Sequence, residues 1–333
     1  MVQLIVPKDH AVVSQRYDYQ NEFQQNSEDY AEHWKWCLPF DTPYGKGTKP
    51  APICFVWKTD VEDAVFQLSE TPAFDAVVFS VSGCVSCEVY NLELDKTYYW
   101  RVGDSEVRSF RTDAAVPRWL KVDGTWNVRD TGGFKTMDGK RIKQGMLYRG
   151  AAFDADEAGD APFVPNGLQT VRDVLKVRCD LDLRGAEQSD SGTVYKGSLL
   201  GEDVRFLQIA CFSAAKFFDY PETCAKLMRV FADESNYPLY YHCAYGSDRT
   251  GILAIVLDVI LGLSEEEVYT NYELSSVAFS DCPRSRHSES FQELEERIRP
   301  YGGSLHERIM TYLDICGVTK EEIERIRAIL LED

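Results

Sequence analysis

Basic side chains are scarce in this chain of 333 residues. Thirty-six Lys and Arg stand against 54 Asp and Glu, so the formal net charge is −18, and there are only five His. Neither half of the chain is basic, and no run of Lys or Arg appears. Nucleic acids and anionic membranes bind through basic surfaces, so we expect no nucleic-acid partner. A phosphorylated ligand would have to be attracted by a local site, against the overall field.

Long apolar runs are missing as well. The apolar stretch 252–263 is too short to cross a bilayer and contains Asp258. The first eight residues hold neither a long apolar region nor a small-residue cleavage site. We therefore expect no stable membrane insertion and a cytoplasmic location, with secretion left open if a signal peptide has been removed.

The cysteines and histidines show no metal-binding pattern. Ten Cys are spread without a repeating spacing, which favours a reducing compartment. Cys84 and Cys87 form a lone C-x-x-C between strand-like runs. We interpret them as ordinary thiols, with a disulfide or a metal site as the alternative. Because no His/Asp/Glu cluster has the spacing of metal ligands, we expect neither metal nor cofactor.

Residues 1–112 have the pattern of β-structure. Short runs rich in branched and aromatic residues recur about every ten residues, a spacing typical of a sandwich; they are 52–58, 64–68, 76–81 and 85–89. Residues 92–102 resemble the tyrosine-corner strand of fibronectin type III domains, and 107–112 would be the last strand. Residues 13–50 are polar and predict a long edge or loop segment. We expect an all-β, fibronectin type III-like accessory domain that is open to protein or glycan contact.

Residues 113–333 instead alternate strands and helices. The predicted strands are 177–183, 204–209 and 237–241, and the predicted helices are 166–175, 221–233, 252–263, 290–298 and 320–331, with a capping box at Ser264. This alternation predicts an α/β fold with a mostly parallel sheet flanked by helices. Ligands bind at the carboxyl ends of such strands, so Cys243 and the 182–184 turn should share one rim. We expect two domains, 1–112 and 113–333, with every catalytic group in the second.

The stretch 242–251, His-Cys-Ala-Tyr-Gly-Ser-Asp-Arg-Thr-Gly, carries the chemistry. A strand leads into it and a helix leads out, which is an arrangement that binds phosphate through backbone N–H groups and the helix dipole. The expected phosphate ligands are Ala244, Tyr245, Gly246, Ser247 and Arg249, the last with a planar fork for two phosphate oxygens. The same field favours the thiolate of Cys243, a nucleophile.

This loop resembles that of the cysteine-dependent phosphatases, and its Asp248-Arg249 pair is similar to the Cys-x4-Asp-Arg loops of myotubularin-type lipid phosphatases and of an atypical bacterial group of tyrosine and phosphoinositide phosphatases. Further stretches resemble the bacterial group; they are 126–133, 145–150, 181–187, 301–305 and 312–317. The resemblance covers about residues 113–333. It implies a cysteine-phosphatase fold and metal-independent hydrolysis of phosphomonoesters through a cysteinyl-phosphate. Ser247 stands where the bacterial group often has Lys.

A leaving oxygen needs a proton. The resemblance implies that Asp248 is the acid; the rival is Asp219, which follows the 204–209 strand and would act from a mobile loop. His242 would orient the loop, and Thr250 would stabilise the leaving thiolate or simply begin the helix.

Several polar residues outside the loop are candidates for supporting roles. Asp182 would hold the loop or the substrate, or form a structural ion pair with an Arg. Asn127, Arg129 and Asp130 would brace the site, or stabilise their own turn.

The residues leave the substrate open. The first prediction is a protein-tyrosine (dual-specificity) phosphatase, and the alternative is a phosphoinositide or inositol-phosphate phosphatase. A second alternative is a non-catalytic phosphate-binding module, which an intact Cys243, Asp248 and Arg249 disfavour. The expected partner is therefore a phosphorylated protein, lipid or inositol.

Overall fold

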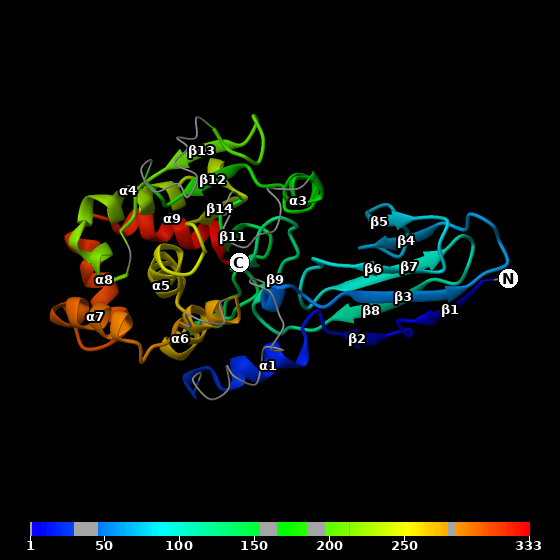
Figure 1. The fold of residues 1–333 in the computed structure, drawn as a ribbon, viewed down its shortest axis with the longest axis horizontal. Coiled ribbons are helices and arrows are strands. Elements are labelled where there is room, and N and C mark those ends of the chain that lie inside the picture. Colours follow the sequence, from blue (N-terminus) through cyan, green and yellow to red (C-terminus); the bar gives the residue numbers. More distant parts are fainter. Residues whose placement is uncertain (1, 30–45, 154–164, 186–196, 213, 279–283) are drawn as a thin grey trace. The chain divides into compact units, whose positions relative to one another are not determined.

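The structure, a computed structural model, describes residues 2–29, 46–153, 165–185, 197–212, 214–278 and 284–333 (Figure 1). The chain divides into two compact units. One consists of Met1–Tyr17 and Pro50–Arg118, and the other of Asp18–Lys49 and Trp119–Asp333. This division differs from a single boundary between residues 112 and 113, because Asp18–Lys49 packs with the second unit.

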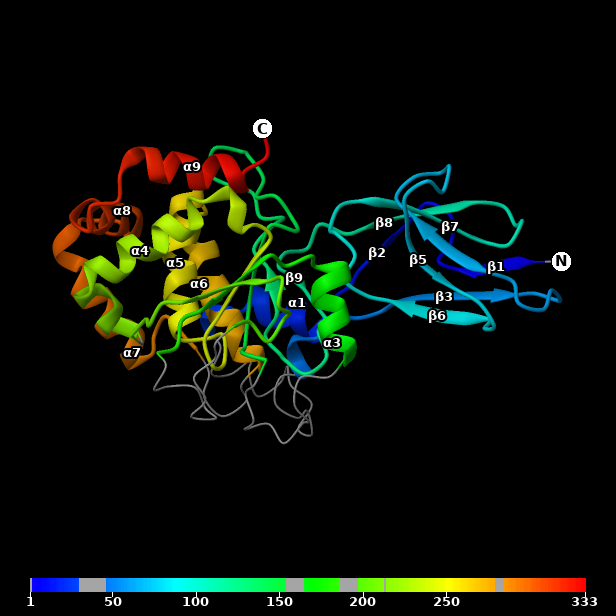
Figure 2. The same cartoon turned by 90° about the horizontal axis from the view of Figure 1, so that it is seen from above.

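The first unit contains two sheets. One has the strand order β1-β3-β6 and is antiparallel, with bounds Gln3–Val6, Ile53–Lys58 and Ser86–Val89. The other has the order β2-β8-β7-β4-β5, with bounds Ala11–Val13, Arg108–Thr112, Thr97–Val102, Phe66–Ser69 and Val77–Val81. Only the β2–β8 pair is parallel. The predicted runs fall on β3 to β8, whereas β1 and β2 were not predicted. Figure 2 shows β3 and β6 apart from β7 and β8.

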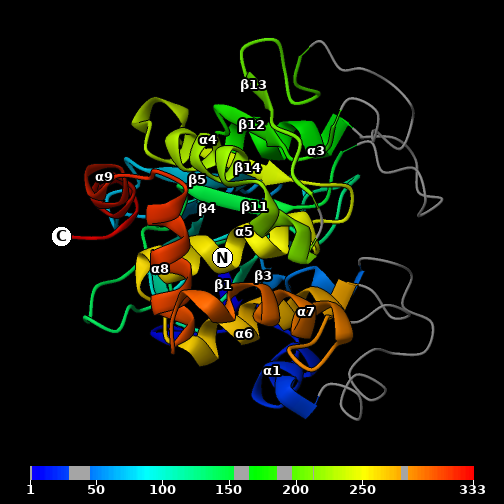
Figure 3. The ribbon, with the colours of Figure 1, turned by 90° about the vertical axis from the view of Figure 1, so that its left-hand side faces the viewer.

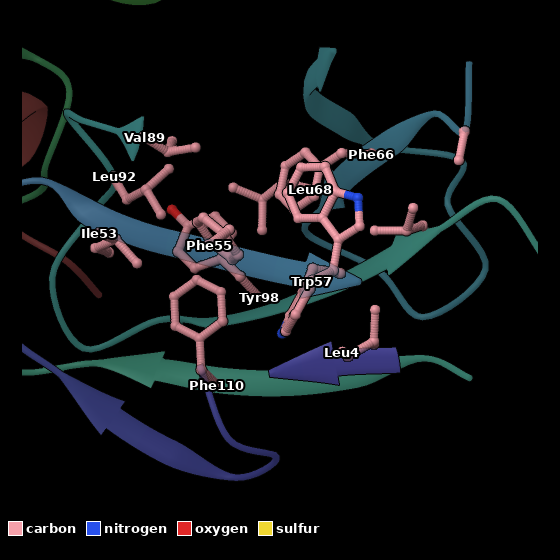
Figure 4. Close-up of a cluster of buried hydrophobic side chains, with 13 residues drawn as sticks. Leu4, Ile53, Phe55, Trp57, Phe66, Leu68, Val89, Leu92, Tyr98 and Phe110 are labelled. Atoms are coloured by element: carbon pink, nitrogen blue, oxygen red, sulfur yellow. The ribbon is translucent and has the colours of Figure 1, made fainter. Parts of the chain in front are cut away.

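Side chains of both sheets meet in one buried cluster (Figure 4). Alternate residues of β3 point into it because successive side chains of a strand face opposite ways. Phe55 contacts Trp100 and Phe110 of the other sheet, with ring centroids 5.3 and 5.6 Å apart. Trp57 stacks on Phe66 at 5.3 Å. Six aromatic side chains are part of this cluster; they are Phe55, Trp57, Phe66, Tyr98, Trp100 and Phe110.

The segment predicted to be irregular, 13–50, contains helical structure. Helix α1 (Asp18–Gln25) is followed by two 3-10 helices, Ser27–Asp29 and Lys46–Thr48; residues 30–45 lie outside the described residues. Helix α1 buries Phe23 and Gln20. A single apolar buried residue leaves no helical periodicity to detect, so the composition concealed this helix.

The second unit is built on a six-stranded sheet in the order β13-β12-β14-β11-β10-β9. The bounds are Arg205–Gln208, Cys179–Asp182, Leu239–His242, Leu147–Gly150, Arg129–Asp130 and Arg118–Trp119. β14 pairs in parallel with both β11 and β12, and β12 pairs in parallel with β13. β10 joins β11 antiparallel. The prediction of an α/β unit with a mostly parallel sheet is confirmed.

Helices surround this sheet. They are α3 (Pro165–Gln169, continued by a π-helical turn Thr170–Val174), α4 (Pro221–Phe231), α5 (Arg249–Leu261), α6 (Glu265–Glu273), α7 (Glu289–Ile298), α8 (Leu305–Ile315) and α9 (Lys320–Leu330). Helix α5 is buried on all sides and packs against α6, α8 and α9 (Figure 3). The predicted capping box at Ser264 is present, since its side chain and that of Glu267 each accept the other's backbone N–H. Within the described ranges no helix is long and apolar enough to span a membrane.

Candidate active site

The predicted phosphate-binding stretch lies at the centre of the sheet's carboxyl edge. β14 ends at His242, and α5 begins at Arg249. We call residues 243–249, which run from the end of β14 to the first residue of α5, the phosphate loop. Cys243 is the first residue after the strand and is only 2% exposed. The loop therefore opens the most buried helix of the unit, so the dipole of that helix points at the loop.

Gly246 fixes how closely the loop approaches the neighbouring strand end. Its φ is +69°, and a Cβ there would lie 2.3 to 2.8 Å from backbone atoms of Gly150 and Ala151. Both facts exclude a side chain, because real Cβ atoms do not approach backbone so closely and L residues rarely adopt such a φ. The 145–150 stretch is thus in contact with the loop.

Donors outside the loop bind its carbonyl oxygens. Ala152 N–H donates to Ala244 O at 3.0 Å. Asn127 Nδ2 donates to the carbonyl oxygens of Tyr245 and Gly246, each at 3.2 Å, and Arg149 Nη2 also donates to Gly246 O at 3.2 Å. In a trans peptide the N–H points away from the C=O. The N–H groups of three successive peptides are therefore turned away from these donors, as in a backbone nest that binds an anion.

His242 bears a positive charge beside the loop. Its Nε2 lies 3.0 Å from Asp180 Oδ1, and its Nδ1 lies 3.2 Å from the carbonyl oxygen of Cys243. Both partners are acceptors, so both ring nitrogens must carry a proton. Burial lowers the pKa of His242, but Asp182 and Asp180 outweigh it and raise the pKa to about 9. The charged ring thus binds the backbone of Cys243, and its predicted role in orienting the loop stays a prediction.

Asp182 forms the ion pair that was one of its two predicted roles. Arg184 binds its Oδ1 through Nε at 3.0 Å and its Oδ2 through Nη2 at 3.0 Å. Asp182 Oδ1 also lies 4.0 Å from His242 Nδ1. Burial raises the pKa of Asp182, but His242 and Arg184 together lower it below its usual value. The 182–184 turn thus supports His242 on the same rim as Cys243.

The two candidate acids have different partners. Asp248 is 40% exposed, and its carboxylate lies 2.8 and 2.9 Å from Nε and Nη2 of Arg284. Asp219 is 48% exposed and pairs with Arg297 of α7. Within the described residues Asp219 has no hydrogen bond or ion pair to the phosphate loop. Asp248 therefore directly precedes α5 and is paired with Arg284, whereas Asp219 is paired with Arg297.

Thr250 is fully buried immediately after the loop. Its Oγ1 has no hydrogen-bond partner among the residues that the structure describes. Most buried hydroxyl groups have a hydrogen-bond partner, so this exception at the start of α5 indicates a functional role for the Thr250 hydroxyl. Arg249, one residue earlier, is partly exposed.

The predicted bracing residues divide into two kinds. Arg129 Nη1 donates to Asn127 Oδ1 at 2.6 Å, and Arg129 Nη2 donates to Asn271 O at 2.9 Å. Asp130 instead accepts the N–H groups of Gly132 and Gly145 at 2.8 and 2.7 Å, which ties the β10–β11 hairpin. Asn127 and Arg129 therefore brace the loop, whereas these contacts of Asp130 brace a turn.

A buried polar group in α5 was not predicted as part of the site. Asp258 accepts a hydrogen bond from Asn271 Nδ2 at 2.7 Å. Burial raises the pKa of Asp258 to about 6, although Asn271, Arg149 and Arg129 oppose that shift. The signal in the sequence is a single Asp inside an otherwise apolar stretch, because a buried carboxyl group needs polar partners.

Metal ligands do not gather here. In the described part of the chain, no three His, Cys, Asp or Glu side chains are grouped so that they could hold a metal ion.

Comparison with known proteins places the loop in a family context. The model of the tyrosine phosphatase family matches residues 120–332. A protein of Cupriavidus necator named as a tyrosine-protein phosphatase is 28% identical over 176 residues, which cover 46% of this chain. The match spans 61% of that relative's length.

A solved structure was also matched. It is the core catalytic domain of the PP-IP phosphatase SIW14 from S. cerevisiae in complex with citrate, at 19% identity and a TM-score of 0.32 over 46% of this chain and 83% of that one.

Proposed function

The chain belongs to the tyrosine phosphatase family, and from this premise we propose that it hydrolyses phosphomonoesters without a metal, through a cysteinyl-phosphate on Cys243. The observation that carries the proposal is the set of outside donors to the carbonyl oxygens of Ala244, Tyr245 and Gly246. These outside donors hold the carbonyl oxygens, so the N–H groups of the same peptides point toward the side where an anion binds. The loop N–H groups can then donate to the equatorial oxygens of the phosphate, where charge lies in the transition state.

The reaction has two displacements at phosphorus. In the first, Cys243 Sγ forms the S–P bond while the ester O–P bond breaks, and the leaving oxygen takes a proton from Asp248. In the second, water forms a new O–P bond, Asp248 takes the water's proton, and Cys243 leaves as a thiolate. Arg249 binds two phosphate oxygens throughout, and the buried hydroxyl of Thr250 donates to the leaving thiolate.

We propose phosphotyrosine as the substrate, in a dual-specificity protein phosphatase. A phosphoinositide or inositol phosphate is the alternative, and one contact favours it. Ser247 replaces the frequent Lys, but Arg284 Nη2 lies 3.3 Å from Ser247 Oγ. A guanidinium from another part of the chain thus stands beside the position of that Lys, where it can bind a second phosphate. A non-catalytic phosphate reader remains the second alternative.

We propose that the first unit is a β-sandwich of fibronectin type III-like kind and supplies no catalytic group. The support is its two sheets around one cluster and the contact of Tyr98, whose hydroxyl oxygen accepts the N–H of Glu93 at 3.1 Å. That local bond is typical of a tyrosine corner. Such a unit would bind a protein or a glycan.

The test is turnover by wild-type protein and Cys243→Ser. We expect wild type to hydrolyse an aryl phosphate and the Ser variant to be inactive with an unchanged thermal midpoint, because a hydroxyl is far less ionised than a thiol near neutral pH. A panel of phosphotyrosine peptide, phosphoinositides and inositol phosphates then separates the substrate classes. Appreciable turnover by Cys243→Ser would refute the nucleophile, and oxyanion binding without any turnover would favour the phosphate reader.

A further inference from the structure

A segment from the N-terminal part of the chain is built into the second unit. In α1, Tyr19 donates its hydroxyl hydrogen to Gly47 O at 3.0 Å. Gln20 Nε2 donates to Gly47 O and Lys49 O at 2.9 and 3.0 Å. Gln20 is fully buried. These bonds fix the 3-10 helix that contains Thr48 onto α1.

Helix α1 is itself anchored on the helices behind the phosphate loop. Phe23 is fully buried in a cluster with Trp119, Leu274 and Val277. Ser27 Oγ lies 3.3 Å from Thr270 Oγ1 of α6. Figures 1 and 3 show α1 beside α6. The position of Thr48 is therefore set by the second unit.

Thr48 contacts the residue that holds the loop. Its Oγ1 accepts the backbone N–H of Asn127 at 3.0 Å, and both residues are buried. Asn127 has a φ of +55°, in the left-handed region that residues other than glycine seldom adopt. The bond from Thr48 satisfies a buried N–H in this conformation and holds the backbone from which the Asn127 side chain extends to the loop.

Asn127 connects this bond to the phosphate loop. Its Nδ2 donates to the carbonyl oxygens of Tyr245 and Gly246. The N–H groups of those two peptides belong to Gly246 and Ser247, and among the described residues none accepts from them. A rotation of the Asn127 side chain would remove one hydrogen bond from Tyr245 O and would leave Gly246 O, among the described residues, with the bond from Arg149 alone. The N–H of Gly246, and to a smaller extent that of Ser247, would then be misdirected for a bound phosphate.

We propose that Thr48 is a positioning residue for phosphate binding and that the described residues 18–29 and 46–49 act as part of the catalytic unit. The proposal rests on the function proposed above. Its source is a contact between parts of the chain that are 79 residues apart. It assigns a task in catalysis to a residue that precedes position 112, although the sequence predicts every catalytic group after that position.

The experiment compares three variants in the full chain. Thr48→Val removes the hydrogen-bond acceptor and keeps the branched shape, whereas Thr48→Ser keeps the oxygen. Ser27→Ala is the control, because it removes a different hydrogen bond, the one from the same segment to Thr270 of α6. The measurements are kcat and KM for an aryl phosphate, the Kd of tungstate by calorimetry, and the thermal midpoint.

We expect Thr48→Val to weaken tungstate binding and to lower kcat/KM by about ten- to a hundredfold, since small displacements of oriented donors have effects of that size. Thr48→Ser should restore both values. Ser27→Ala should lower the thermal midpoint and change neither. The loss of kcat/KM and of tungstate affinity in Thr48→Val should be measurable at temperatures well below the thermal midpoint of that variant.

Two outcomes would overturn the proposal. The first is that wild-type protein is active and that Thr48→Val and Ser27→Ala have the same kcat/KM and the same tungstate affinity. Thr48 would then have a purely structural role. A loss in Thr48→Val that Thr48→Ser does not restore would also exclude the hydrogen bond as its cause. The proposed function fails separately, because then wild-type protein itself shows no turnover. If wild type neither turns over substrate nor binds tungstate, both proposals fail.

Discussion

The charge on His242 should make the stability of the protein depend on pH. We consider the replacement His242→Gln, which removes a buried imidazolium held by Asp180 and by the carbonyl oxygen of Cys243. The pKa of this histidine rises from 6.5 to about 9 on folding. A group whose pKa is raised by folding binds its proton more tightly in the folded state than in the unfolded state, and this difference is free energy of folding.

The size of the effect follows from the shift. One pKa unit corresponds to about 1.4 kcal/mol, so the protonated ring contributes about 3 kcal/mol. This contribution is fully present below pH 6.5, the unfolded value, and is lost as the pH rises through 9, the folded value. The stability of wild type minus that of His242→Gln should therefore fall by about 3 kcal/mol between pH 6 and pH 9.5.

Urea unfolding at half-unit pH steps measures this difference, and an imidazole resonance titrated by NMR gives the pKa directly. His10→Gln is the matched control, because the side chain of His10 is 84% exposed. A difference that stays constant from pH 6 to pH 9.5 would refute the reasoning. So would a His242 resonance that titrates near 6.5.

The remaining predictions concern the loop. Asp248→Asn should slow a tyrosyl or inositol phosphate about a hundred- to ten-thousandfold and a nitrophenyl phosphate much less, because only the poor leaving groups need a proton; Asp219→Asn, whose carboxylate pairs with Arg297, should change neither rate, and the reverse pattern would exchange their roles. Gly246→Ala should abolish tungstate binding because its Cβ would meet the backbone of Gly150, while Gly139→Ala, also at positive φ but in open space, should bind normally; equal binding would show that the loop tolerates the clash. EDTA should leave turnover intact while vanadate suppresses it, and activity restored by a divalent ion after EDTA would indicate another class of enzyme.

The sequence could predict the parts of the site that are local. A strand, a loop with Cys243 and Arg249, and an apolar helix follow one another without interruption, so each supports the identification of the next. The predicted carboxyl edge also holds, since β12 and β14 pair in parallel and end at Asp182 and His242. Parallel pairing places their ends together whatever the intervening chain does.

The sequence could not predict contacts between distant stretches. Arg284 and Asp248 are 36 residues apart, and Arg149 and Gly246 are 97 apart. No spacing rule relates such pairs, because their distance depends on tertiary packing. Helix α1 was missed for a related reason. It buries Phe23 as its one apolar residue, and that residue packs against side chains more than ninety positions later.

The acidic composition and the phosphate loop are compatible for a physical reason. With a net charge of −18 the surface repels a phosphorylated ligand, but salt screens exposed charges beyond about 8 Å at physiological ionic strength. The groups that face the ligand are backbone N–H dipoles held by buried donors, and their short-range interactions are screened much less. The orientation of each N–H group depends on the hydrogen bond that holds the carbonyl oxygen of the same peptide. Ala152, Asn127 and Arg149 supply these bonds, and Thr48 fixes Asn127. Binding of an anion by this acidic protein therefore depends on buried hydrogen bonds from distant parts of the chain more than on its total charge.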